Sequence, residues 1–249
     1  MSPRAGRLLA AVLLLAACGG GGGGASGDRV LVSAAASLTD VFTAMEAAFE
    51  DANPGVDVVF NFGPSSGLRE QILEGAPVDV YASADEANMA RLVDAGEVAG
   101  EPHAFARNRL QIVVPEGNPG GVTGLADFAR DDLLVGLCAD GVPCGVLARE
   151  LLANAGVDPV VDTDEPDVRS LLTKVAEGEL DAGIVYATDV LATDGVEGVE
   201  VPPEHQVETG YPIAVLGEAP NRDGAEKFVA FVMSEAGRSI LSSFGFAAP

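Results

Sequence analysis

The feature that most constrains the fold is a junction at which an apolar run ends at a serine and an amphipathic helix pattern begins. Residues 30–37 read VLVSAAAS, and residues 38–49 then carry apolar side chains at three- and four-residue spacing. This spacing predicts a helix, and the apolar run before it predicts a buried strand. The pattern therefore predicts that Ser37 opens the helix as its N-cap.

The same junction recurs three more times along the chain. Residues 56–62 (VDVVFNF) predict a strand, and Ser65 in the following GPSSG opens the next predicted helix. Residues 133–138 (LLVGLC) predict a strand that leads through the loop ADGVPCG into a helix. Residues 159–164 (PVVDTD) predict the fourth strand, and Pro166 suits the first turn of the helix after it.

Repeated strand-to-helix junctions indicate an α/β fold with an anion site. The first turn of a helix leaves backbone N–H groups unpaired, and the helix dipole adds about half a positive charge there. In open α/β sheets these turns meet at the carboxyl ends of the strands, where ligands bind. A serine that stands alone is better explained as a simple helix cap, but four junctions favour an anion bound between two halves.

The N-terminus has the layout of a secretory signal. Arg4 and Arg7 precede an apolar run at residues 8–17, which is too short to span a bilayer. We therefore expect residues 1–17 to be a signal peptide. No later stretch of the sequence is apolar enough to cross a membrane.

The end of this segment, LAAC, resembles the bacterial lipobox, in which the cysteine is lipid-modified and becomes the new N-terminus. We expect Cys18 to carry the lipid and residues 18–29, which include six consecutive glycines, to form a flexible tether. This predicts a protein anchored by lipid to the extracytoplasmic face of the cell membrane. The alternative is an ordinary secreted protein in which Cys18 occurs by chance.

Two cysteines remain after Cys18. Cys138 and Cys144 are six residues apart, and an even pair in an oxidising compartment predicts a disulfide. A metal site is less favoured, because His103 and His205 show no ligand spacing relative to the cysteines.

The net charge limits the classes of ligand. The chain has 38 acidic and 14 basic residues and a net charge of −24, which argues against nucleic-acid binding. A small anion is still compatible, because salt screens exposed carboxylates beyond about 8 Å whereas local N–H dipoles act at contact.

Several motifs resemble, in this order, the bacterial molybdate-binding proteins of ABC importers. They are AAASLTD, GAPVDVYASAD, DVRSLL, GIVYATD, YPIAVL and SEAGRSILSSFGF, and the resemblance covers residues 30–246. It implies a two-lobed periplasmic-binding-protein fold of the α/β class. Each lobe is expected to be a mixed sheet flanked by helices, with RLQIVVP and YPIAVL as the two crossover strands. We expect residues 30–107 plus 211–249 to form lobe I and residues 108–210 to form lobe II.

The resemblance also implies the function and the site. It implies a non-enzymatic, monomeric receptor that binds molybdate or tungstate as a ligand, without a cofactor, and delivers it to a membrane permease. Carried over to this sequence, Ser37 and Ser65 bind through hydroxyl and backbone N–H, Cys144 and Val168 bind through backbone N–H, and Tyr186 donates its phenol. The family usually has a small residue such as alanine where Cys144 stands.

Three alternatives remain open. The receptor could bind another oxyanion such as sulfate, or the chain could be a scaffolding lipoprotein without a small ligand. The sequence around Ser65 also matches the G-x-S-x-G motif of serine hydrolases, with Asp189 and His205 in the right order downstream. Pro64 within the motif and the lack of an HGGG segment argue against the hydrolase.

Overall fold

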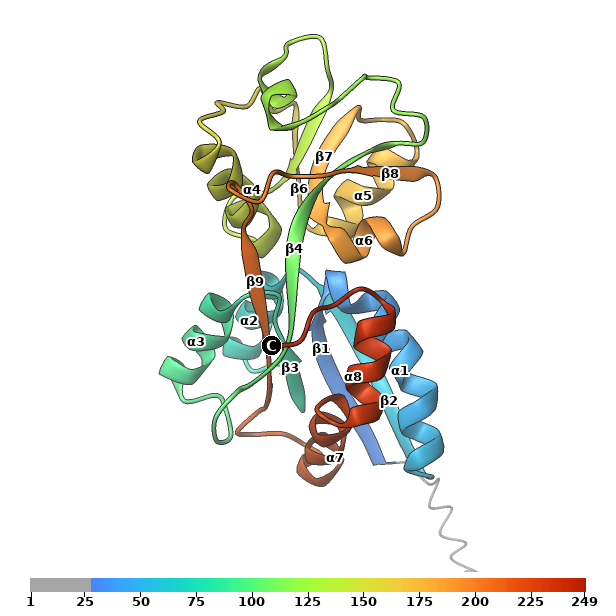
Figure 1. The fold of residues 1–249 in the computed structure, drawn as a ribbon. Coiled ribbons are helices and arrows are strands. Elements are labelled where there is room, and N and C mark those ends of the chain that lie inside the picture. The colour runs from blue at the N-terminus through green and yellow to red at the C-terminus, as the bar shows by residue number, and fades with distance from the viewer. Residues whose placement is uncertain (1–27) are drawn as a thin grey trace, which may run out of the picture.

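The computed structural model describes residues 28–249, so the predicted signal peptide, Cys18 and nearly all of the glycine-containing tether lie outside the described residues. Figure 1 shows two groups of elements, one above the other, connected by the long strands β4 (His103–Pro115) and β9 (Glu208–Val215). None of the described helices is long and apolar enough to span a bilayer.

Group 1 contains the N-terminal strands and the last two helices. Its strands are β1 (Asp28–Ala35), β2 (Val56–Gly63) and β3 (Val80–Ala82), and β1 pairs in parallel with both others. Its helices are α1 (Thr39–Ala52), α2 (Ser65–Leu73), α3 (Glu86–Ala95), α7 (Arg222–Val232) and α8 (Glu235–Ser243).

Group 2 is built from the middle of the chain. Its strands are β5 (Val135–Cys138), β6 (Thr163–Glu165), β7 (Ala182–Tyr186) and β8 (Val196–Val199), and β5 pairs in parallel with β6 and β7. Its helices are α4 (Pro143–Asn154), α5 (Val168–Ala176) and α6 (Ala187–Leu191), with the short 3-10 helix η2 (Leu125–Ala129). The α/β fold class and the mixed sheet are confirmed.

The strand β4 changes partners along its length. Residues 103–109 pair antiparallel with β9, whereas residues 110–115 pair with β7 and β8. The resulting strand order is β2-β1-β3-β9-β4-β7-β5-β6. The segment predicted as the first crossover, RLQIVVP, thus lies mainly inside group 2, and the connection itself begins at His103. A continuous apolar strand gives no local sign of where its partners change.

The predicted apolar face of α1 is buried and forms the core of group 1. Phe42 and Phe49 are fully buried, and their ring centroids lie 5.7 and 5.3 Å from that of Phe228 in α7. Edge-to-face aromatic pairs of this kind add stability beyond area burial. The C-terminal helices therefore return to pack on the first helix.

Three details at helix starts differ from the predictions. Ser37 is not an N-cap, because a 3-10 turn, η1 (Ala36–Leu38), separates β1 from α1. Pro166 precedes the N-cap Asp167 of α5 instead of lying in its first turn. Conversely, α4 begins at Pro143, inside the segment predicted as a loop, because proline fits the first helical position.

Candidate functional site

All five predicted site residues line a single cavity between the two groups. The cavity lies where β1, β2 and β7 end and where α2, α4 and α5 begin. Its volume of about 20 Å³ is far below the roughly 300–1,000 Å³ of sites for drug-sized ligands. The lining residues are Ala35, Ala36, Ser37, Gly63, Pro64, Ser65, Ala84, Val142, Pro143, Cys144, Asp167, Val168 and Tyr186. Its size suits an ion of a few atoms.

Two helix N-termini present backbone N–H groups at this cavity. Cys144 is the second residue of α4, and Val168 is the first residue of α5. Neither N–H group has an acceptor within its own helix, and both helix dipoles place their positive ends here. The two helix ends therefore favour a negative charge in the cavity, although most residues at its wall are uncharged.

The hydroxyl of Ser65 is oriented by a backbone contact. Ser65 is the first residue of α2, is 1% exposed, and its Oγ accepts a hydrogen bond of 3.0 Å from the N–H of Ala84. Its carbonyl oxygen accepts from the hydroxyl of Tyr81 at 2.8 Å. Because Ser65 Oγ is an acceptor toward Ala84, its own hydrogen is free to donate elsewhere.

The hydroxyl of Tyr186 has no hydrogen-bond partner among the described residues, although it is buried. Burial raises the pKa of Tyr186 well above its ordinary value, so the phenol stays protonated and can donate. A buried hydroxyl without a partner costs about 1–3 kcal/mol. An acceptor in the cavity would remove this cost.

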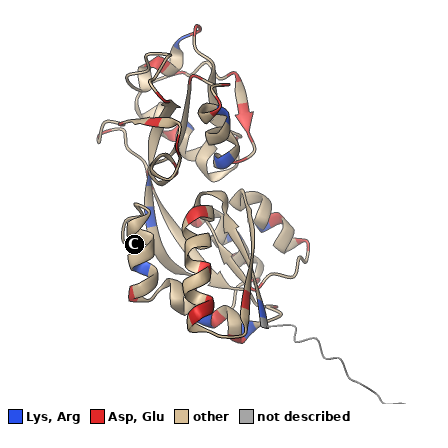
Figure 2. Ribbon diagram, turned by 90° about the vertical axis from the view of Figure 1, so that its right-hand side faces the viewer, with Lys and Arg blue, Asp and Glu red and all other residues tan. Residues whose placement is uncertain are grey.

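The carboxylates around the cavity are engaged in other contacts. Asp167 lines the cavity but caps α5, accepting from the N–H of Ser170 at 2.9 Å. Asp40 accepts from the guanidinium of Arg169 at 2.7 Å. Among the described residues, the acidic side chains are spread over both groups (Figure 2). The cavity thus offers mainly hydrogen-bond donors.

The predicted disulfide is confirmed. Cys138 at the end of β5 is bonded to Cys144 in the first turn of α4, with their Cα atoms 5.7 Å apart. The bond ties one of the cavity's N–H donors to the sheet. Within residues 28–249, no group of three or more His, Cys, Asp or Glu residues is arranged to bind a metal ion.

The residues of the hydrolase alternative are not brought into a triad. Ser65 Oγ contacts Ala84, and the carboxylate of Asp189 accepts from the N–H of Tyr186 at 3.2 Å. Among the hydrogen bonds of the described residues, none joins Ser65, Asp189 and His205 to one another. Nucleophile and base must lie within hydrogen-bonding reach for this chemistry.

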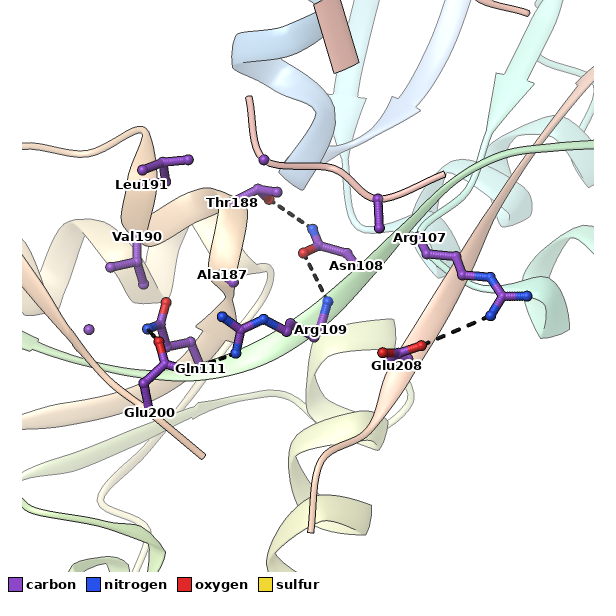
Figure 3. Close-up of a pocket in the computed structure, with 13 residues that line it drawn as sticks. Arg107, Asn108, Arg109, Gln111, Ala187, Thr188, Val190, Leu191, Glu200 and Glu208 are labelled. Atoms are coloured by element: carbon purple, nitrogen blue, oxygen red, sulfur yellow. Dashed lines mark hydrogen bonds and ion pairs between the residues drawn. The ribbon is translucent and has the colours of Figure 1, made fainter. Parts of the chain in front are cut away.

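A larger cavity of about 530 Å³ lies against β4, α6 and β8 (Figure 3). Its arginines are paired, since Arg109 contacts Glu200 at 2.8 Å and Arg107 lies 4.0 Å from Glu208. None of the five predicted residues lines it. Its buried wall includes Asn108, which donates to Thr188 Oγ1 at 2.8 Å. Sequence reasoning did not select Asn108, because no motif marks it.

Comparisons with known proteins identify a family and several relatives. The family model of the bacterial extracellular solute-binding proteins matches residues 30–247. The chain is 41% identical over 221 residues to the molybdate-binding protein ModA of Mycobacterium tuberculosis, with coverage of 88% of this chain and 85% of that protein.

Two solved structures share the fold. The periplasmic molybdate-binding protein of Azotobacter vinelandii aligns with a TM-score of 0.76 at 19% identity, covering 88% of this chain and 99% of that chain. The sulfate-binding protein SubI of Mycobacterium tuberculosis aligns with a TM-score of 0.79 at 21% identity, covering 88% of this chain and 86% of that chain. At these identities the likeness concerns the fold alone.

Proposed function

Because this chain belongs to the bacterial extracellular solute-binding proteins, we propose that it captures molybdate or tungstate for an ABC importer. The observation that carries the proposal is the buried hydroxyl of Tyr186, which has no hydrogen-bond partner within residues 28–249 and lies in a small cavity between helix N-termini. A receptor of this kind binds and releases its ligand unchanged, so we propose no catalytic residue and no cofactor.

We assign the oxyanion contacts to the five residues that line the cavity. The hydroxyls of Ser37, Ser65 and Tyr186 and the backbone N–H groups of Cys144 and Val168 donate to the oxygens. Hydrogen bonds to a charged acceptor are about twice as strong as neutral ones, and helix N-termini bind anions without a cationic side chain.

A set of donors selects against ions that carry a proton. Phosphate near neutral pH has at least one proton, which in this cavity would need an acceptor or would cost about 1–3 kcal/mol. Sulfate has none, so sulfate must be distinguished by its smaller size. The fold resembles both a molybdate-binding and a sulfate-binding protein, and the 41% identity to a molybdate-binding protein favours molybdate.

We propose that the two groups of elements are two lobes that close on the ion. Lobe I comprises residues 30–107 plus 211–249, and lobe II comprises residues 108–210. Strands β4 and β9 connect them and would act as the hinge, because small changes at strand ends suffice for domain closure.

The remaining assignments concern the cell. We propose that residues 1–17 are removed as a signal peptide, that Cys18 carries a lipid, and that the protein acts as a monomer at the outer face of the cell membrane. The partner there is the membrane permease of the importer.

The test is a thermal-shift screen of the protein with molybdate, tungstate, sulfate and phosphate, followed by isothermal titration at pH 7. A ligand at 100 times its Kd adds about 2.7 kcal/mol to the free energy of unfolding. We expect molybdate and tungstate to bind alike, sulfate far more weakly and phosphate scarcely at all. Sulfate binding as tight as molybdate would make the protein a sulfate receptor, and no binding of any oxyanion would refute the proposal.

A further inference from the structure

A chain of buried polar side chains leads from the cavity to the strands that connect the two groups. Ser37 Oγ lies 2.9 Å from the hydroxyl of Tyr211 in β9. The side-chain nitrogen of Asn108 in β4 lies 3.5 Å from the same hydroxyl and 2.8 Å from Thr188 Oγ1 in α6. All four residues are buried.

The direction of these hydrogen bonds follows from Asn108. Its side-chain oxygen accepts a hydrogen bond of 3.0 Å from the backbone N–H of Arg109 (Figure 3). This N–H group can only donate. The amide orientation is therefore fixed, and both hydrogens of the side-chain nitrogen point toward Thr188 and Tyr211. Asn108 can only donate to these two hydroxyls.

This donor sets the hydroxyl of Tyr211. The hydrogen bonds of the described residues give this hydroxyl two partners, Asn108 and Ser37. Because its oxygen accepts from Asn108, its own hydrogen is directed to Ser37 Oγ. Burial raises the pKa of Tyr211, so that hydrogen is present at any physiological pH. Ser37 Oγ then accepts from Tyr211, and the hydrogen of Ser37 is left to point away from Tyr211, toward the cavity that Ser37 lines.

We propose that Tyr211 and Asn108 are positioning residues, which hold the Ser37 hydroxyl as a donor to the bound oxyanion. The inference rests on the proposed function. It assigns no direct ion contact to either residue. In addition, hydrogen bonds that follow one another in the same direction polarise each other, which strengthens the bond from Ser37 to the ion.

The test is a double-mutant cycle measured by isothermal titration with molybdate at pH 7. We expect Tyr211→Phe to weaken binding about tenfold in the parent and less than twofold in a Ser37→Ala background, because the effect passes through the Ser37 hydroxyl. Tyr81→Phe is the matched control. It removes another buried tyrosine hydroxyl, which contacts Ser65 and not Ser37, so its effect should be equal in both backgrounds.

A second variant reverses the chain of hydrogen bonds. In Asn108→Asp a carboxylate, which only accepts, replaces the donor, so Tyr211 turns its hydrogen away from Ser37. We expect Asn108→Asp to weaken molybdate binding more than Tyr211→Phe does. We also expect the effect of Asn108→Asp to be smaller in the Ser37→Ala background than in the parent. Thermal unfolding of each variant without ligand checks that it folds.

The outcomes separate the two proposals. A parent protein that binds neither molybdate nor tungstate overturns the proposed function and this inference together. A second outcome is that the parent binds molybdate, but Tyr211→Phe and Asn108→Asp each weaken binding by the same factor with and without Ser37→Ala. This outcome leaves the proposed function intact and overturns the inference alone. Unchanged affinity in both variants also overturns it.

Discussion

The carboxylate of Asp40 and the guanidinium of Arg169 form an ion pair of 2.7 Å between α1 of group 1 and α5 of group 2. Among the ion pairs of residues 28–249, it alone joins a helix of one group to a helix of the other. Arg169 directly follows the cavity residue Val168. The pair therefore lies beside the proposed oxyanion site and bridges the two halves.

We expect this pair to favour the closed arrangement. Because both side chains are about one-third exposed, its contribution is at most about 1 kcal/mol. Arg169→Gln and Asp40→Asn should therefore each weaken molybdate binding up to about fivefold, with the difference from the parent shrinking at high salt. Titration calorimetry at two ionic strengths measures this.

A control and a competing explanation are available for this prediction. Arg130→Gln breaks an ion pair with Asp132 inside group 2, outside the cavity lining, and should leave the affinity unchanged. If Arg169 acted on the ion only through its charge, Asp40→Asn would strengthen binding. Opposite effects of the two substitutions would thus contradict a bridging role.

Ser65→Ala should affect both stability and binding. It leaves the buried N–H of Ala84 without an acceptor, which should lower the free energy of unfolding by about 1–3 kcal/mol. It also removes a proposed donor to the ion, which should weaken molybdate binding by roughly 1–3 kcal/mol. Ser66→Ala, in the same turn but outside the cavity lining, is the control for chemical unfolding and titration.

Reduction of the disulfide should leave a folded protein. The loop from Cys138 to Cys144 is short, so by chain entropy the bond contributes less than about 3 kcal/mol. Thiol labelling of the unfolded, unreduced protein should find neither cysteine free, and reduction should release both. Because we propose that Cys144 binds through its backbone N–H, we expect the reduced protein to retain molybdate binding. A free thiol at either position before reduction would contradict the disulfide.

Asp189 should make stability depend on pH. Burial raises its pKa from 3.8 to about 7, with Arg169 acting in the opposite direction. The folded state therefore binds this proton more tightly than the unfolded state, and the resulting stability is lost as pH rises through 7. Between pH 5 and pH 8 we expect the free energy of unfolding to fall by about 2–3 kcal/mol more in the parent than in Asp189→Asn. Urea unfolding of both proteins at both pH values measures this difference. An equal change of the free energy of unfolding in the parent and in Asp189→Asn would contradict the shifted pKa.

Local patterns in the sequence predicted several helices and strands and the helix starts at the cavity, whereas the family resemblance implied the assignment of Cys144, Val168 and Tyr186 to the site. The apolar spacing of residues 38–49 predicted the buried face of α1, and the junctions at Ser65 and before Val168 marked two helix starts. Helix starts and apolar faces depend on neighbours a few residues apart, so a single sequence contains that information. The spacing of Cys138 and Cys144 likewise predicted a bond within one short loop.

The tertiary structure alone decided the contacts between distant segments. Ser37 was predicted as a helix cap, but its hydroxyl contacts Tyr211, 174 positions away, and Asp40 contacts Arg169, 129 positions away. Which strands pair, and where β4 exchanges β9 for β7, determines these contacts. A local pattern cannot specify them, because the partner of a polar side chain is chosen by the packing of whole elements and by the need to satisfy buried donors and acceptors.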